Sequence, residues 1–212
     1  MTKPRVLLAD DHRMVAEGLK SLLEEEFELA GIVEDGRALV SAACELRPDV
    51  IVADISMPHL NGIDALVSLK QDNPRARVVF LTMHRDVAYA RRALEAGALG
   101  FVLKHSAPAE LLLAVRAALE GRTFIAPDLA AELLRTASQH PEAGTDPVAA
   151  MTPRQREILQ LFVEGKSAKV IASELGISPR TVEDHKYRLM ETLGIENSAE
   201  LVHFAIKHGV VP

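Results

Sequence analysis

The sequence has almost no cysteine and no long apolar run, and both absences limit the class of protein. Its single cysteine, Cys44, cannot form an internal disulfide. It stands among Ala42, Ala43 and Leu46 in a helix-patterned stretch, so we predict that it lies in a core. No apolar run approaches the roughly 18 residues of a membrane span, and the amino-terminal run is too short for a signal peptide. We therefore expect a protein of the reducing cytoplasm.

The composition excludes a disordered chain and indicates two globular domains. Apolar residues make up 48% and charged residues 25% of the sequence, which is the composition of an ordinary globular protein. The length of 212 residues indicates two domains, because a domain has roughly 100 to 200 residues. Residues 1–121 hold 14 basic and 18 acidic groups, residues 122–150 hold 2 and 4, and residues 151–212 hold 8 and 8. The net charges are therefore −4, −2 and 0. The last third repels a polyanion least, although neutrality alone does not indicate nucleic-acid binding.

Short apolar runs alternate with helix-patterned segments in the first 121 residues. Near-continuous apolar strands of this kind are typical of a parallel sheet that is covered on both faces. The fold class is therefore α/β, and we predict a flavodoxin-like, doubly wound, five-stranded parallel sheet over residues 1–121. The expected strands are VLLA (6–9), ELAGIV (28–33), VIVA (50–53), VVFL (78–81) and LGFVL (99–103).

The remainder of the chain reads as a linker followed by a helical domain. Residues 122–147 are predicted to be a linker with a possible short helix at 128–138, because Pro and Gly interrupt the later part. Residues 148–212 have a helical period throughout. The turn LGIS joins the second and third predicted helices, which indicates a small all-α helix-turn-helix domain. Its helices are expected to begin at a capping box from Thr152 to Gln155, and at Ser167, Ser178 and Ser198.

Polar residues follow the strands of the predicted sheet, where the carboxyl ends of parallel strands form a ligand site. They are Asp10, Asp11, Asp54, Thr82 and Lys104. Three carboxylates at one edge repel one another unless a hard divalent cation such as Mg²⁺ neutralises them. A lysine and a threonine beside them could bind an anion. This combination suits phosphoryl transfer to a carboxylate.

The segments that carry these residues resemble a known family. LLADDH, DISMPHLNGIDAL, VVFLTMH and GALGFVLKHSAP are similar to the receiver domain of bacterial two-component response regulators, over about residues 3–121. The resemblance implies that Asp54 accepts a phosphoryl group from the phosphohistidine of a sensor histidine kinase. It implies that Asp10, Asp11, Asp54 and the Ser56 carbonyl hold Mg²⁺. It also implies that Lys104 and Thr82 bind the phosphoryl oxygens, so that the chain catalyses only its own phosphorylation and dephosphorylation.

Other positions take expected roles from the same resemblance. Phe101 stands at the family's switch aromatic and lacks a tyrosine hydroxyl, and its ring is expected to become buried as Thr82 moves inward. Met57-Pro58 and Gly62 would shape the loop after the acceptor, with Gly62 permitting a tight turn. Ser56 and His84 are positions that modulate phosphoryl lifetime, although a solvated loop position is an equal alternative for His84.

A second α/β class also uses an aspartate, a threonine and a lysine. An aspartyl-phosphate phosphatase of the haloacid dehalogenase kind needs a second aspartate two residues after its nucleophile on the first strand. Here His12 stands two residues after Asp10. That departure argues against this class.

The segment from Met151 to Ile195 resembles the LuxR-type helix-turn-helix, which places the protein with the NarL/FixJ subfamily of response regulators. A helical projection of 178–193 turns Val182, Leu189 and Leu193 inward and leaves a polar face that could enter the major groove of DNA. The expected DNA-binding residues are Lys166, Lys169, Arg180, Thr181, Glu183, Asp184, Lys186, Tyr187 and Arg188.

Weak charge in this domain suggests binding as a dimer. Five basic and three acidic residues over 166–188 leave only +2, so we expect homodimers on activation that engage two half-sites of promoter DNA. Val202, Ile206 and Val210 of the last helix are expected either to form the dimer contact or to complete the core. The isolated histidines show no metal-ligand spacing.

One alternative function remains open. The chain could be a phosphorylation-independent DNA-binding regulator that uses its receiver only as a dimerisation module. The complete set of acidic residues argues against this alternative.

Overall fold

The computed structural model describes residues 2–83, 87–106, 108–139, 147–148, 151–208 and 210. The chain divides into two compact units, residues 1–141 and residues 142–212. None of the helices in these described ranges is long and apolar enough to cross a membrane.

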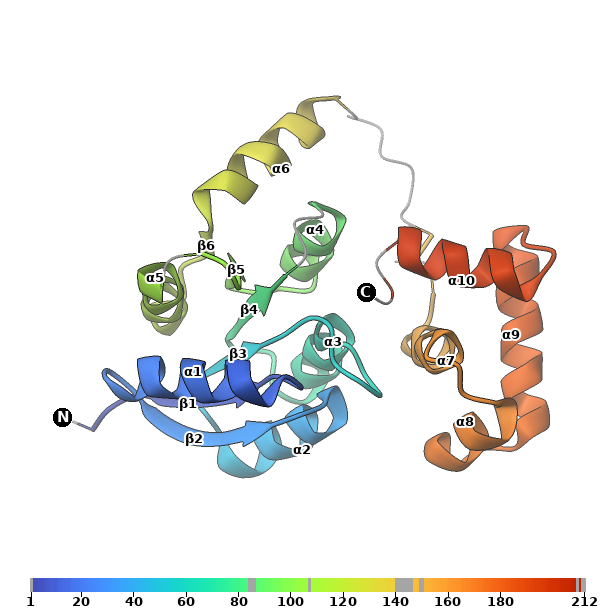
Figure 1. Cartoon of the computed structure of the whole chain (residues 1–212), viewed down its shortest axis with the longest axis horizontal. Helices are drawn as coiled ribbons and strands as arrows, with labels where there is room; N and C mark the ends of the chain where they lie inside the picture. Colours follow the sequence, from blue (N-terminus) through green and yellow to red (C-terminus); the bar gives the residue numbers. More distant parts are fainter. Residues whose placement is uncertain are drawn as a thin grey trace. The chain divides into compact units, whose positions relative to one another are not determined.

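The first unit is built on a parallel sheet with the strand order β2-β1-β3-β4-β5-β6 (Figure 1). The prediction of a doubly wound α/β fold is confirmed, but the predicted count of five strands is wrong. The sixth strand pairs with β5 through only two residues, which is too short for a periodic pattern in the sequence. The strands are β1 (Arg5–Ala9), β2 (Glu28–Val33), β3 (Val50–Ala53), β4 (Val78–Thr82), β5 (Gly100–Leu103) and β6 (Phe124–Ile125).

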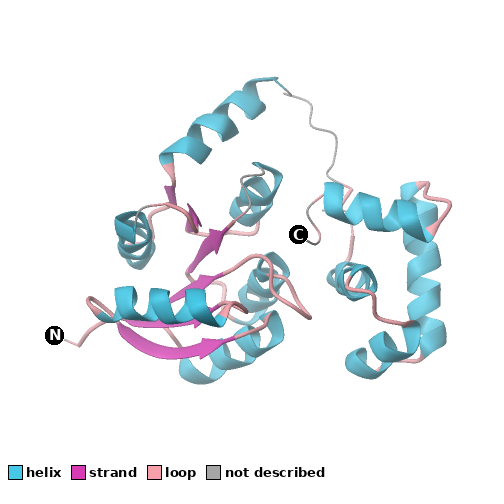
Figure 2. Cartoon of the chain, viewed as in Figure 1, coloured by secondary structure: helices cyan, strands magenta, loops and turns pink. Residues whose placement is uncertain are grey.

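Helices cover both faces of this sheet (Figure 2). Successive residues of β1 point to opposite faces, so Val6 and Leu8 join one apolar core while Leu7 and Ala9 join the other. The core with Val6 is closed by α1 and α5, and the core with Leu7 is closed by α2, α3 and α4. These helices are α1 (Arg13–Glu24), α2 (Gly36–Leu46), α3 (Gly62–Asp72), α4 (Val87–Glu95) and α5 (Pro108–Leu119).

A sixth helix, α6 (Pro127–Gln139), lies where the possible short helix of the linker was predicted. Its Leu129 is buried in the same core as Phe101 of β5 and Tyr89 of α4. Together with β6, this helix joins the predicted linker to the packing of the first unit. Residues 140–146 of the linker, and residues 149–150 after it, lie outside the described residues.

Cys44 is exposed, so the prediction that it lies in a core is wrong. It belongs to α2, which packs against the sheet with only one of its faces. Ala42, Ala43 and Leu46 lie against the core, whereas position 44 falls on the outer face of the helix.

The described residues of the second unit form four helices, and the predicted tight turn joins α8 and α9. The capping box is confirmed, because the Thr152 hydroxyl accepts from the Gln155 N–H and the Gln155 side chain accepts from the Thr152 N–H. Ser167 and Ser178 cap the next two helices as predicted. The fourth helix is capped by Asn197 and not by Ser198, because the Asn197 side-chain oxygen reaches the Glu200 N–H at 2.9 Å. The helices are α7 (Pro153–Val163), α8 (Ala168–Leu175), α9 (Pro179–Leu193) and α10 (Ser198–Lys207).

The segment before α7 is anchored to this second unit. Val148 is fully buried with Leu201 and Val210. The buried Arg156 guanidinium donates to the carbonyl oxygens of Met151 at 2.7 Å and Val148 at 3.3 Å. These contacts satisfy backbone acceptors that burial would otherwise leave without a partner.

Candidate functional site

Strand register brings the predicted acidic residues together at the carboxyl edge of the sheet. Ala9 of β1 is paired with Ala53 of β3, so Asp10 and Asp54, which follow them, leave the sheet at the same level. The Asp54 N–H donates to the Ala9 carbonyl at 2.8 Å. β1 lies between β2 and β3, so this edge is the point where the strand order reverses, and ligand sites of such sheets occur there.

Lys104 bridges the two buried carboxylates. Its Nζ lies 2.6 Å from Asp54 Oδ2 and 2.8 Å from Asp10 Oδ2. Register again explains the placement, because Leu103 is paired with Thr82 and the Lys104 N–H donates to the Thr82 carbonyl at 2.8 Å. The side chains of Asp10, Asp54 and Lys104 are only 1%, 4% and 6% exposed. A buried charge without a partner is unfavourable, so each of these groups depends on the others.

The environment shifts the pKa of both Asp54 and Lys104. Burial raises the pKa of the Asp54 carboxyl and the charge of Asp10 raises it further, while Lys104 and the Ser56 N–H act in the opposite direction. Burial alone would lower the pKa of the Lys104 ammonium. Its hydrogen bonds and charge contacts with Asp10 and Asp54 outweigh burial, and the pKa is raised. Lys104 therefore stays protonated at neutral pH.

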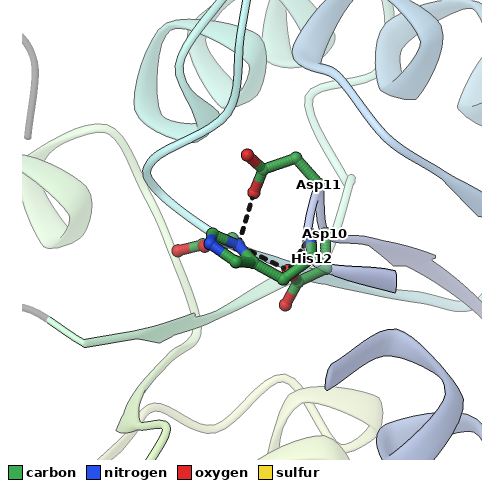
Figure 3. A group of neighbouring side chains, drawn as sticks. Asp10, Asp11 and His12 are labelled. Atoms are coloured by element: carbon green, nitrogen blue, oxygen red, sulfur yellow. Dashed lines mark hydrogen bonds and ion pairs between the residues drawn. The ribbon is translucent and has the colours of Figure 1, made fainter. Parts of the chain in front are cut away.

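Asp11 and His12 are exposed and lie beside the buried Asp10 at this edge of the sheet (Figure 3). His12 Nδ1 lies 2.8 Å from Asp11 Oδ1 and 3.4 Å from Asp10 Oδ1. The ligand atoms of Asp10, Asp11, His12 and Asp54 all lie within 4.8 Å of one another. From the sequence we predicted that the histidines show no metal-ligand spacing, but the structure places His12 among possible metal ligands. Its position directly after two aspartates at a strand end was the available signal.

The donor set fits a divalent cation. Carboxylate oxygens converge from two strand ends, and hard cations prefer such oxygen ligands. One ammonium cannot neutralise three carboxylates, so negative charge remains for a cation to balance. The acidic cluster could therefore bind a metal ion.

The other predicted receiver residues surround this pocket. Thr82 is fully buried at the end of β4, and the Ser56 N–H donates to Asp54 Oδ1 at 3.3 Å. The Phe101 ring is fully buried, between Phe80 on β4 and Ile125 on β6 in register. The inward position that we expected on activation is therefore already present. His84 lies outside the described residues.

Gly62 is needed for a different reason than the predicted tight turn. It does not have a positive φ, unlike His59 in the same loop. A Cβ at position 62 would lie 2.3 Å from the Asp54 carbonyl oxygen and 2.9 Å from a Phe80 ring carbon. The Gly62 N–H donates to the Ile55 carbonyl at 2.8 Å. Glycine at position 62 therefore allows the chain after Asp54 to pack directly on the Asp54 backbone.

Helix α9 of the second unit presents the predicted polar face. Val182 is buried against α7 and α8, and Leu189 is buried against α7 and α10, as the helical projection predicts. Tyr187 is 67% exposed. Its neighbours on this face are exposed at Arg180, Asp184 and Arg188, and half-buried at Thr181 and Glu183.

Two of the predicted DNA-binding lysines have side-chain partners within the second unit. Lys166 Nζ lies 3.0 Å from Glu174 Oε2 and 3.3 Å from Glu164 Oε2. Lys186 Nζ lies 4.5 Å from the centre of the Phe162 ring, a cation–π contact. Lys169 is exposed. The exposed cations of this surface are thus Lys169, with Arg180 and Arg188 on α9.

The apolar residues Val202, Ile206 and Val210, which we expected either in the core or in a dimer contact, differ in their burial. Val210, just after the helix, is buried, and Val202 is half-buried. Ile206 is 52% exposed. Val210 therefore completes the core, whereas Ile206 is available for another molecule.

The first unit has an α/β fold with a lysine-bridged acidic cluster at the point where the strand order reverses. The second unit is a helix-turn-helix, and this combination defines a two-domain regulator. Comparisons with known proteins agree. The family model described as "Response regulator receiver domain" matches residues 6–116, and the model described as "Bacterial regulatory proteins, luxR family" matches residues 149–205. The chain belongs to the bacterial response regulators that combine a receiver with a LuxR-type helix-turn-helix, and such regulators bind DNA.

Relatives match over the whole length. The transcriptional regulatory protein MctR of Rhizobium johnstonii is 37% identical over 211 residues, which cover 99% of this chain and 96% of MctR. The solved structure of the RcsB response regulator of Salmonella typhimurium has a TM-score of 0.67 and 30% identity, covering 98% of this chain and 99% of RcsB. RcsB of Salmonella enterica serovar Typhimurium, bound to a promoter with the phosphomimetic BeF3−, has a TM-score of 0.63 and 29% identity, covering 96% and 98%.

Proposed function

We propose that Asp54 is the phospho-acceptor of a receiver that a sensor histidine kinase charges. A carboxylate oxygen of Asp54 attacks the phosphorus of a phosphohistidine. An O–P bond forms while the N–P bond breaks, and the departing imidazole nitrogen takes a proton. The carrying observation is the buried Asp54 carboxylate, held 2.6 Å from the Lys104 ammonium beside two further aspartates. The reaction modifies the chain itself rather than an external substrate.

We propose Mg²⁺ as the cation of this pocket, held by Asp10, Asp11 and Asp54 with the Ser56 carbonyl. When bound, it supplies positive charge to the carboxylates and the phosphoryl oxygens. The chain's own contribution is to position these groups. Asp54 and Asp10 are fixed by strand register, and the Ser56 N–H holds one oxygen of Asp54. Preformed geometry of this kind lowers the barrier without a further catalytic base.

Lys104 and Thr82 then bind the new phosphoryl oxygens. At rest Lys104 contacts a carboxylate oxygen of Asp54, so it exchanges that contact for a phosphoryl oxygen. Thr82 ends the strand beside Phe101. A movement of Thr82 therefore changes the packing around the Phe101 ring, which α4 and α6 share. We propose this shared packing as the two-state element that phosphorylation biases.

Helix α9 is the proposed DNA-reading element. Its exposed Arg180, Asp184, Tyr187 and Arg188 would enter the major groove together with the half-buried Glu183 on the flank of this face. Lys169 of α8 would lie near the backbone phosphates. One helix-turn-helix unit offers few exposed basic side chains to DNA, so a single unit should bind weakly. We therefore propose that two chains bind two half-sites of a promoter as a homodimer on activation. The exposed Ile206 of α10 is a candidate for that dimer contact. RcsB, the relative solved on promoter DNA, supports this reading.

A labelling experiment tests the acceptor. With Mg²⁺ and acetyl phosphate, the full-length protein should gain one phosphoryl group by intact mass spectrometry, and Asp54→Asn should gain none. The control is Asp72→Asn, which changes an exposed carboxylate at the end of α3 and should label normally. Equal labelling of the Asp54 variant would refute the assignment. An unlabelled wild-type protein that still bound promoter DNA would favour the phosphorylation-independent alternative.

A further inference from the structure

His12 is a fourth potential ligand at the acidic pocket. The Asp11 carboxylate points toward its ring, with Nδ1 2.8 Å from Asp11 Oδ1 (Figure 3). Within the described part of the chain, no other group of three or more histidine, cysteine or carboxylate side chains could hold a metal ion. The proposed magnesium site does not require an imidazole, so the role of this ring is a separate question.

The ring does not serve the helix that begins beside it. His12 occupies the N-cap position of α1, but its side chain makes no capping hydrogen bond. Its backbone N–H donates to Asp10 Oδ1 at 2.9 Å instead. The imidazole is therefore held on the carboxylates. Its side chain is 62% exposed, so the ring can turn without disturbing the core.

Coordination chemistry separates the cations that such a pocket could bind. Mg²⁺ prefers oxygen ligands and keeps several of its waters. First-row transition cations such as Mn²⁺ and Zn²⁺ accept imidazole nitrogen as a ligand. Their affinity for sites with nitrogen and oxygen ligands rises from Mn²⁺ to Cu²⁺ and is lower again for Zn²⁺. A nitrogen donor beside three carboxylates therefore favours a transition cation over Mg²⁺.

We propose that His12 sets the metal selectivity of this pocket. With Mn²⁺ a ring nitrogen of His12 becomes a ligand, whereas with Mg²⁺ the ring stays hydrogen-bonded to Asp11. This inference rests on the proposed function, because it assumes that the aspartates bind a divalent cation. It assigns His12 no part in the phosphoryl transfer itself.

Metal binding to the full-length, tag-free protein tests this proposal. Electron paramagnetic resonance measures Mn²⁺ binding directly, and Mg²⁺ is measured by competition. His12→Gln should weaken Mn²⁺ binding by about tenfold and Mg²⁺ binding by less than about threefold. The matched control is His203→Gln, an exposed histidine of α10, which should change neither. Electron spin echo modulation should detect ¹⁴N coupling to bound Mn²⁺ in wild type and control, and lose it in His12→Gln.

The outcomes separate this inference from the proposed function. Equal weakening of both cations by His12→Gln would mean that the ring only orients Asp11, which overturns the inference. Absence of nitrogen coupling in the wild-type protein overturns it as well. In both cases the wild-type protein would still bind Mg²⁺ and be labelled at Asp54, and the proposed function would stand. A wild-type protein that bound neither cation would overturn both.

Discussion

Replacing Lys104 by methionine should destabilise the receiver in a pH-dependent way. The substitution keeps most of the side-chain volume but removes the ammonium that contacts Asp10 Oδ2 at 2.8 Å and Asp54 Oδ2 at 2.6 Å. Both carboxylates are buried, and removing one partner of a buried ion pair costs about 3 to 5 kcal/mol. We expect a loss of this size at pH 7.5 in urea unfolding followed by circular dichroism, because the chain has no tryptophan.

The pH dependence follows from the pKa of Asp54, which burial already raises from its ordinary value of 3.8. A carboxyl whose folded-state pKa is raised is most compatible with folding when protonated, so stability falls as pH rises through that pKa. Without Lys104 the pKa of Asp54 rises further. The deficit of Lys104→Met should therefore be smaller at pH 5 than at pH 7.5.

Controls isolate the charge from other effects of the substitution. Lys20→Met removes a half-buried lysine of α1, whose Nζ lies 4.0 Å from Glu17 Oε2, and should change the free energy of unfolding by less than about 0.5 kcal/mol. Adding Asp54→Asn to Lys104→Met should recover part of the loss. Mg²⁺ should stabilise Lys104→Met more than wild type, because the ammonium no longer competes for the carboxylates. If Lys104→Met were as stable as Lys20→Met at pH 7.5, Lys104 would not be neutralising buried charge.

Two further predictions concern DNA reading and backbone packing. Glu183→Ala should reduce the discrimination between bases at one position per half-site by about 1 to 3 kcal/mol. Arg188→Ala should instead weaken binding to all DNA sequences alike and lower the salt dependence of binding by roughly one per lost phosphate contact. Binding curves for target and scrambled duplexes at several salt concentrations distinguish the two effects. Gly62→Ala should destabilise the receiver by about 1 to 3 kcal/mol, because the added Cβ would collide with the Asp54 backbone. Gly18→Ala adds a Cβ in open space on α1 and should stabilise the receiver by about 0.5 to 1 kcal/mol. Urea unfolding that gave both variants the same stability would contradict this explanation.

The sheet and the acidic pocket were predictable because their signals are local. Near-continuous apolar runs marked the strands of the sheet. Asp10 and Asp54 follow two of these runs directly, so parallel pairing alone brings them together. Strand β6 was missed because two residues carry no period, and Phe124 and Ile125 pair only because β5 offers an open edge.

Side-chain partners were harder to predict. Lys166 looked like a free phosphate contact, but it pairs with Glu174 on the following helix. Cys44 was placed in a core because its neighbours are apolar, although the helix turns that position outward. Asn197 caps α10 in place of the adjacent Ser198, since two neighbouring residues had comparable capping tendencies. Such choices depend on contacts that the sequence pattern does not specify.

The packing of α6 determines where this protein could be recombined with its relatives. Phe101 lies in register with Ile125, and its core includes Leu129 of α6. A domain exchange that joined another protein at residue 121 would separate Phe101 from both Ile125 and Leu129. An exchange after Gln139 would carry the intact interface with the receiver. A receiver that is transferred between proteins should therefore include α6, the helix that we predicted to be part of the linker.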